Sequence, residues 1–149
     1  MRVLLVNGSP HEKGCTHVAL GIVKESLEDQ GIQADFFWIG DKPLTGCIGY
    51  GYCEKAGRCR YDDRVNEFLA QAVGYDGFVF GVPVHFASAA SSMSAFMDRA
   101  FFTDHCAGLR LFELKPGAII TSARCAGTTA TLDQMSKYLM YAQMPVVSS

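Results

Sequence analysis

The chain has 149 residues, enough for one domain with a real core, and its 49% hydrophobic and 19% charged composition is that of an ordinary globular protein. The net charge of −2 gives no electrostatic footprint for nucleic acid or for an anionic membrane surface. We therefore expect residues 1–149 to form a single domain that binds neither nucleic acid nor a membrane.

The spacing of apolar residues changes at regular intervals along the chain, from continuous or alternating runs to helical spacing. The runs predict strands over residues 2–7, 33–39, 77–81, 118–121 and 144–148. The helical spacing predicts helices over residues 15–30, 62–73, 89–102 and 129–142. Apolar side chains on these helices should face a sheet, among them Val73, Leu132 and Met140.

Strands rich in Val, Ile, Leu and Phe that alternate with helices predict an α/β fold with a doubly wound parallel sheet. Ligands of such folds bind beyond the carboxyl ends of the strands. Residues 8–16, 82–88 and 122–128 each follow a predicted strand. These three loops should therefore lie together along one rim.

Two stretches have the hydropathy of targeting or spanning segments but not their pattern. At the N-terminus only residues 3–7 precede a turn, too few for a signal peptide. Residues 78–97 carry no formal charge, but Pro83, His85 and four serines interrupt them, as in a strand, a loop and a helix. We expect a soluble, cytoplasmic protein, whose six cysteines are then thiols or a metal-type site rather than disulfides.

The turn "NGSPHEKGCT", residues 7–16, does not match two well-known phosphate loops. Five residues separate Gly8 from Gly14 and no lysine follows, unlike a Walker A loop, and Pro10 stands where a dinucleotide fingerprint has its second glycine. The turn keeps the hydroxyls of Ser9 and Thr16 and, from Gly14 and Cys15, a helix N-terminus that attracts anions. It suits a terminal phosphomonoester, unless Thr16 simply caps the helix.

The other two rim loops combine flat, small and polar residues. "GVPVHFASAASS", residues 81–92, offers Pro83, the rings of His85 and Phe86, small residues and serines, and "TSARCAGTT", residues 121–129, offers Ser122, Arg124 and Gly127. Each loop alone is also compatible with a neutral histidine or a capped helix start. The three loops together favour a flat, phosphorylated ligand.

"NGSPHEKGCT", "GVPVHFASAASSMSAFMDR" and "SARCAGTTATLDQMSKYLMYAQMPVVSS" resemble the NADPH-dependent FMN reductase and iron-sulfur flavoprotein group, in order and over nearly the whole chain. The resemblance implies a flavodoxin-like sheet of strand order 2-1-3-4-5, FMN as cofactor, NAD(P)H as cosubstrate and a homodimer. It implies that FMN is bound by Ser9, His11, Gly14, Cys15, Thr16, Pro83, Val84, His85, Phe86, Ser88, Ser122, Arg124 and Gly127.

The chemistry would then be carried by the flavin, and the protein need supply no nucleophile. The electron acceptor stays open among free flavin, a quinone, an aromatic nitro or azo compound and a partner protein. A flavodoxin-type electron carrier is the alternative, although such carriers are usually more acidic than a net charge of −2. A small cysteine phosphatase needs C-x5-R, whereas only four residues separate Cys53 from Arg58.

Flavodoxin-like domains end with a helix after the fifth strand, whereas the sequence stops at Ser149, directly after "MPVVSS". We expect no final helix in residues 1–149, so that either the sequence is truncated or another chain covers that face of the sheet.

Cys47, Cys53 and Cys59 lie in a glycine-rich segment after the second predicted strand, with five residues in each gap. In the iron-sulfur members of the family this segment looks like C-x2-C-x2-C followed by a fourth cysteine. When the present sequence is aligned with that pattern, Tyr50 stands at the second cysteine position. A [4Fe–4S] cluster normally takes four thiolates, and the gaps do not match the usual zinc spacing, although His105 could supply a fourth zinc ligand. We predict no metal and a loop of reduced thiols.

Overall fold

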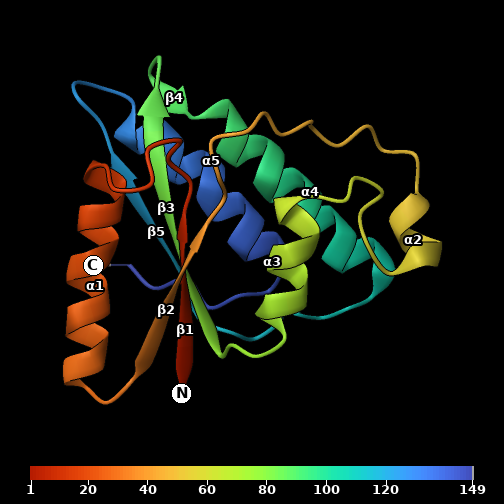
Figure 1. Ribbon diagram of the computed structural model, residues 1–149, viewed down its shortest axis with the longest axis horizontal. Coiled ribbons are helices and arrows are strands. Elements are labelled where there is room, and N and C mark those ends of the chain that lie inside the picture. The colour runs from red at the N-terminus through yellow and green to blue at the C-terminus, as the bar shows by residue number, and fades with distance from the viewer. Residues whose placement is uncertain (149) are drawn as a thin grey trace.

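The computed structural model describes residues 1–148 and has a central sheet with helices on both faces (Figure 1). The strands are β1 (Arg2–Asn7), β2 (Gln33–Trp38), β3 (Gly77–His85), β4 (Ser88–Ala89) and β5 (Gly117–Ser122). The helices are α1 (Cys15–Asp29), α2 (Tyr52–Ala56), α3 (Arg64–Ala72), α4 (Ser91–Ala107) and α5 (Thr128–Tyr141). Apart from the short elements α2 and β4, strands and helices alternate, as the sequence predicts for a doubly wound fold.

The four longer strands are parallel and lie in the order β2-β1-β3-β5. The register is continuous across the sheet, since Val6 of β1 lies opposite both Phe37 of β2 and Phe80 of β3. Val6 is fully buried in the cluster between the sheet and helices α3, α4 and α5. This order confirms the predicted parallel α/β architecture.

The predicted fifth strand lies where the sequence placed it, beside β5, but it forms only an isolated parallel bridge between Gly117 and Val146. The Gly117 N–H donates to the Pro145 carbonyl at 2.9 Å, and the Val147 N–H donates to the Gly117 carbonyl at 2.8 Å. Pro145 has no N–H to continue the ladder, which explains why the pairing is so short.

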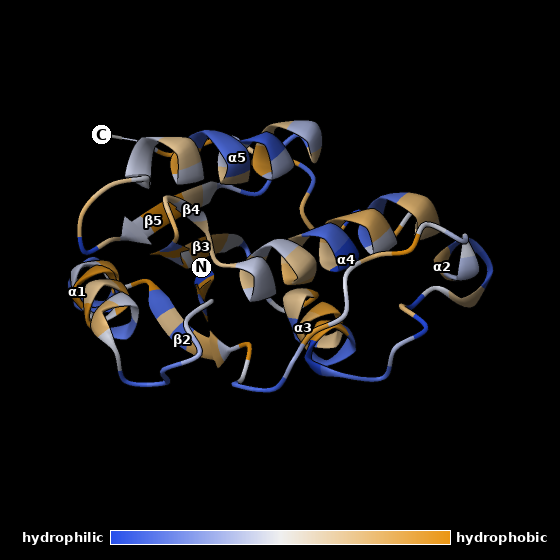
Figure 2. Ribbon diagram, turned by 90° about the horizontal axis from the view of Figure 1, so that it is seen from above, coloured by the Kyte–Doolittle hydropathy of each residue, from blue (hydrophilic) through white to orange (hydrophobic). Residues whose placement is uncertain are grey.

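Two hydrophobic clusters hold the helices to the sheet (Figure 2). The larger cluster lies between the sheet and helices α3, α4 and α5, and its centre includes the fully buried rings of Phe68, Phe80 and Phe96. The smaller cluster lies under α1 and includes Leu5 and Leu20. Helix α1 therefore covers one face of the sheet, and α3, α4 and α5 cover the other (Figure 1).

Three apolar residues do not lie in the core as their spacing predicts. Val73 is 68% exposed at the end of α3, and Met140 and Leu132 are 57% and 39% exposed on α5. On α5 the neighbours Met135 and Leu139 fill the core position instead, so only a narrow stripe of this helix is buried.

Helix α4 runs five residues beyond its predicted end and stops at Gly108, whose φ of 63° is typical of a helix C-cap. The apolar residues 78–97 are divided between β3, β4 and α4, as the sequence predicts. Within residues 1–148, none of the helices combines the length and hydropathy needed to cross a bilayer.

Helix α2 is not predicted by the sequence, which indicates only a glycine-rich loop there. It has five residues and lies between Gly51 and Gly57, both in the left-handed region with φ of 73° and 66°. It packs on α4 at the end of the molecule farthest from the sheet (Figures 1 and 2).

Candidate functional site at the carboxyl ends of the strands

The carboxyl ends of β1, β3 and β5 meet at the upper edge of the sheet in Figure 1, together with the first turns of α1, α4 and α5. The strand register fixes the neighbours at this edge: Asn7 lies opposite Gly81, and Pro83 lies opposite Ser122. The three loops singled out in the sequence therefore share one rim.

Side chains of the protein itself fix the shape of the first loop. The Asn7 side chain, 1% exposed, accepts from the Ser9 N–H at 3.1 Å and donates to the Glu12 carbonyl at 2.9 Å. Ser9 Oγ accepts from the His11 N–H at 3.1 Å, and Trp38 Nε1 donates to the Ser9 carbonyl at 2.7 Å. Sequence reasoning missed Asn7 and Trp38, although a buried amide at a strand end is a signal for such a role.

Helix α1 begins at this loop without a side-chain cap. Its N-cap is Gly14, and no side chain accepts from the first turn. Thr16 lies inside the helix and is buried, and its hydroxyl lies 2.8 Å from Ser122 Oγ, so the capping interpretation of Thr16 is wrong. The N–H groups of this turn are left without side-chain partners and carry the positive end of the helix dipole, which is a ready anion site.

Two glycines allow α1 and the first loop to lie directly on β3. A Cβ at Gly8 would lie 2.6 Å from Met93 Sδ and 2.8 Å from the Gly81 carbonyl oxygen. A Cβ at Gly81 would lie 2.7 Å from both Thr16 Cγ2 and Leu20 Cδ1. This close approach brings the start of α1 to Ser122 of β5.

The second rim segment is a hairpin and not the loop expected over residues 82–88. Strand β3 continues to His85 and pairs antiparallel with Ser88 and Ala89 of β4. The two tip residues, Phe86 and Ala87, have φ of 46° and 63°, as a two-residue type I′ turn requires. This turn is usually signalled by Asn-Gly, and Phe-Ala gave no such signal.

The third loop touches that hairpin. Gly127, with φ of 100°, is the N-cap of α5, which also begins without a side-chain cap. A Cβ at Gly127 would lie 2.5 Å from the carbonyl carbon of Ala87, so only glycine fits. Gln134 of α5, which sequence reasoning missed, accepts from Ser88 Oγ and donates to Ser94 Oγ, both at 3.3 Å.

The predicted site residues divide into two groups at this rim. Those wholly or partly within the protein are Ser9, Gly14, Thr16, Pro83, Val84, Ser122 and Gly127. Those exposed on the rim surface are His11, Cys15, His85, Phe86, Ser88 and Arg124. The rim thus combines buried or partly buried hydroxyls and amides with two aromatic rings that are exposed to solvent.

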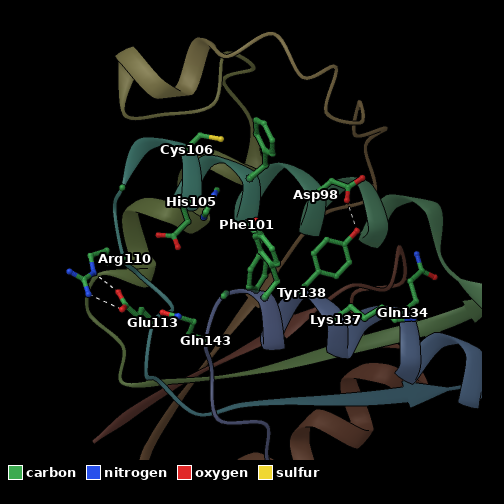
Figure 3. Close-up of a pocket in the computed structure, with 15 residues that line it drawn as sticks. Asp98, Phe101, His105, Cys106, Arg110, Glu113, Gln134, Lys137, Tyr138 and Gln143 are labelled. Atoms are coloured by element: carbon green, nitrogen blue, oxygen red, sulfur yellow. Dashed lines mark hydrogen bonds and ion pairs between the residues drawn. The ribbon is translucent and has the colours of Figure 1, made fainter.

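A separate groove of about 1030 Å³ lies between α4 and α5 (Figure 3). Two pairs of polar side chains line it: Tyr138 donates to Asp98 across the two helices, and Arg110 bonds to Glu113. Burial and the Asp98 carboxylate raise the pKa of Tyr138. His105, considered in the sequence as a metal ligand, lies here with its ring 5.5 Å from that of Tyr141.

A parallel sheet of this order, with an uncapped helix N-terminus and hydroxyls after its first strand, defines a flavodoxin-like α/β protein. The family model described as NADPH-dependent FMN reductase matches residues 1–149, so the chain belongs to that family.

Two relatives carry the name iron-sulfur flavoprotein. One, from Methanocaldococcus jannaschii, is 30% identical over 148 residues, 99% of this chain and 76% of its own. The other, from Archaeoglobus fulgidus, is 31% identical over 94 residues, 63% of this chain. The chain covers only 48% of that second relative's length.

Solved structures support the same fold. RosB with bound 8-demethyl-8-formylriboflavin-5′-phosphate matches with a TM-score of 0.77 at 15% identity, over 98% of this chain and 61% of RosB. FerB, an NAD(P)H:(acceptor) oxidoreductase from Paracoccus denitrificans, matches with a TM-score of 0.70 at 15% identity, over 99% and 75% of the two chains.

Proposed function

We propose that this chain binds FMN and oxidises NAD(P)H, passing the electrons to a small acceptor. The observation that carries the proposal is the uncapped start of α1 beside the hydroxyls of Ser9 and Thr16. Free amides, hydroxyls and a positive dipole end suit a compact phosphate. The family assignment supports FMN as the molecule that carries it.

The first loop would hold the 5′-phosphate through Ser9, His11, Gly14, Cys15 and Thr16. Ser9 and Thr16 are buried, and the backbone around them is ordered by Asn7 and Trp38. A loop ordered in advance loses little conformational entropy when it binds its ligand.

The flavin ring would lie along the hairpin at Pro83, Val84, His85, Phe86 and Ser88. The exposed rings of His85 and Phe86 and the small residues beside them suit a flat ring system. The hairpin is held in place by its contact with Gly127 and by the Ser88–Gln134 hydrogen bond.

The third loop would place hydrogen-bond donors beside the edge of the flavin ring where negative charge builds on reduction. Ser122, Arg124 and the backbone up to Gly127 lie at the same strand end as Pro83. Cationic and N–H donors at that place stabilise the reduced state without a protein nucleophile. FMN, when bound, supplies hydride acceptance and electron transfer in one or two steps.

An absorption spectrum of the purified protein tests the binding step. We expect a yellow protein, or one that becomes yellow and quenches flavin fluorescence when FMN is added. A colourless protein that leaves added FMN unquenched would contradict FMN binding.

Steady-state oxidation of NADH and NADPH by the FMN-loaded protein tests the reaction. We expect turnover with free flavin or a quinone as acceptor. Bound FMN without turnover in the presence of any acceptor would support an electron carrier instead. We also propose the cytoplasmic location that the sequence pattern predicts and the homodimer that the resemblance implies.

A further inference from the structure

The cysteine segment, residues 45–63, contains none of the residues proposed for the flavin site. It contains Cys47, Cys53 and Cys59, and relatives of this chain are named for an iron-sulfur centre. The structure allows a test of whether the segment fits such a cluster.

The three thiols lie in three different environments. Cys47 is exposed, whereas Cys53 is buried on α2 and neighbours Cys106 of α4. Burial and this neighbouring thiol raise the pKa of Cys106, which opposes its use as a thiolate ligand. Cys59 is half-buried and is bound elsewhere, as described next.

Cys59 is held at its sulfur, its N–H and its carbonyl. Its sulfur accepts from both Nε and one terminal nitrogen of Arg99, each at 3.2 Å. Its N–H donates to the Asn66 side chain, and its carbonyl accepts from the same side chain, each at 2.9 Å. These bonds fix the position of the Cys59 sulfur against α4.

Arg99 is the centre of this arrangement. Its side chain is only 1% exposed, and it forms a two-pronged ion pair with Asp63 at 2.7 and 2.9 Å. It also donates to the carbonyls of Thr45 and Tyr61, and its guanidinium lies 4.9 Å from the centre of the Tyr61 ring. One buried side chain of α4 therefore bonds to residues at both ends of the cysteine segment.

The remaining space is small. The cavity lined by the three cysteines measures about 30 Å³, room for one or two water molecules. Tyr50, which stands at the second ligand position, has the Arg60 guanidinium 5.3 Å from the centre of its ring. Within residues 1–148, no three His, Cys, Asp or Glu side chains are gathered so that they could hold a metal ion.

We infer that this chain holds no iron-sulfur cluster. In place of a cluster, Arg99 orders the cysteine segment against α4 through its bonds to Asp63 and Cys59. The thiols of the cysteine segment then stay metal-free. This inference does not depend on whether FMN binds.

Metal analysis gives the first test. Protein purified without oxygen, and protein incubated with ferrous iron and sulfide, should contain neither iron nor acid-labile sulfide. About four of each per chain would overturn the inference. One bound zinc per chain would overturn it as well.

Thiol labelling tests the role of Arg99. Iodoacetamide labelling, followed at each cysteine by peptide mass spectrometry, should be slow at Cys59 and fast at the exposed Cys47. Arg99→Lys keeps a positive charge but loses the two-pronged fork, so labelling of Cys59 should become several-fold faster. Arg58→Lys is the matched control, because Arg58 is half exposed and pairs only with Asp62.

Equal labelling of Cys59 in the wild type and in Arg99→Lys would contradict the role given to Arg99. If Arg99→Lys does not fold, as judged by circular dichroism, Asp63→Asn replaces it. That variant keeps the arginine and weakens only its anchor, and it should also speed the labelling of Cys59. Unchanged labelling there would overturn the inference equally.

Discussion

At the residue scale, the rim depends on side chains that bind one another before any ligand arrives. Thr16 is 2% exposed, and its hydroxyl already has Ser122 Oγ as a neighbour at 2.8 Å. A hydroxyl can donate to one group and accept from another, so Thr16 can bind Ser122 and a phosphate oxygen at once. A buried threonine in the first turn is therefore better explained by binding than by helix capping.

Thr16→Ala should weaken FMN binding by about 1.5–3 kcal/mol, the usual value of a hydrogen bond to a charged group. Quenching of flavin fluorescence on titration measures the dissociation constant. Thr16→Ser is the control, because it keeps the hydroxyl and should retain most of the affinity. Equal affinity of the Ala variant and the wild type would remove Thr16 from the site.

Asp104 of α4 gives a residue-scale prediction for stability. Its carboxylate accepts from the Leu111 N–H at 2.7 Å and so holds the turn after α4. Burial raises the pKa of Asp104 above its ordinary value of 3.8, and the Leu111 N–H only partly opposes this. The folded state thus binds this proton more tightly than the unfolded state, and the resulting stability is lost as the pH rises above 3.8 through the folded pKa.

Asp104→Asn keeps an oxygen acceptor for Leu111 but cannot ionise. The free energy of unfolding of this variant, relative to the wild type, should therefore increase as the pH is raised from below 3.8 toward neutrality. Urea unfolding at a series of pH values measures it. Asp133→Asn, on the exposed face of α5, is the control, and a pH-independent difference for Asp104→Asn would show the assignment wrong.

At the scale of elements, the site depends on how closely α1 lies on β3. Gly81 lies on the inner strand β3, opposite the end of β1, and the missing Cβ leaves space for Thr16 and Leu20 of α1. The helix carries both the buried Leu20 and the uncapped first turn, so its packing and the position of its N-terminus are coupled.

Gly81→Ala should lower the free energy of unfolding by about 1–3 kcal/mol, because the new Cβ overpacks the contact at 2.7 Å. It should also weaken FMN binding by shifting the start of α1. Gly21→Ala is the matched control: nothing lies within 4 Å of its Cβ, and in mid-helix it should stabilise by about 0.5–1 kcal/mol. Thermal and urea unfolding measure the stability of both variants. Equal changes in the free energy of unfolding would mean that α1 can move away from β3 freely.

At the scale of the whole molecule, the rim proposed for the flavin and the cysteine segment lie in different parts of the structure. Both connect to α4, whose first turn lies at the rim and whose Arg99 holds the segment (Figure 1). The groove between α4 and α5 leaves Phe102 and Tyr141 39% and 76% exposed. Large exposed aromatic side chains are common at protein interfaces.

We expect the protein to form a homodimer in solution, as its family resemblance implies. Sedimentation equilibrium at several protein concentrations should give a mass twice that of one chain. A concentration-independent monomer, with or without FMN, would contradict the dimer. FMN binding and NAD(P)H turnover of that monomer would then show that the rim functions within one chain.

The sequence by itself determined the order of strands and helices, because each element buries one apolar stripe and its spacing shows which kind of element it is. It also singled out the turn that we propose for the phosphate, because a glycine, hydroxyls and a following helix are adjacent in the chain. Only the tertiary structure decided the details that depend on distant neighbours. The Phe86–Ala87 turn is stabilised by its contact with Gly127, and α2 is ordered on α4, so local sequence signals neither.

The same distinction applies to the cysteines. Spacing showed that three thiols were available, but not that Arg99, forty residues beyond Cys59, would bind one of them. A buried guanidinium is stable only where it is paired, and its partners are set by the fold rather than by their separation in the chain. The residue types came from the sequence, and their pairing came from the packing of α4 on the cysteine segment.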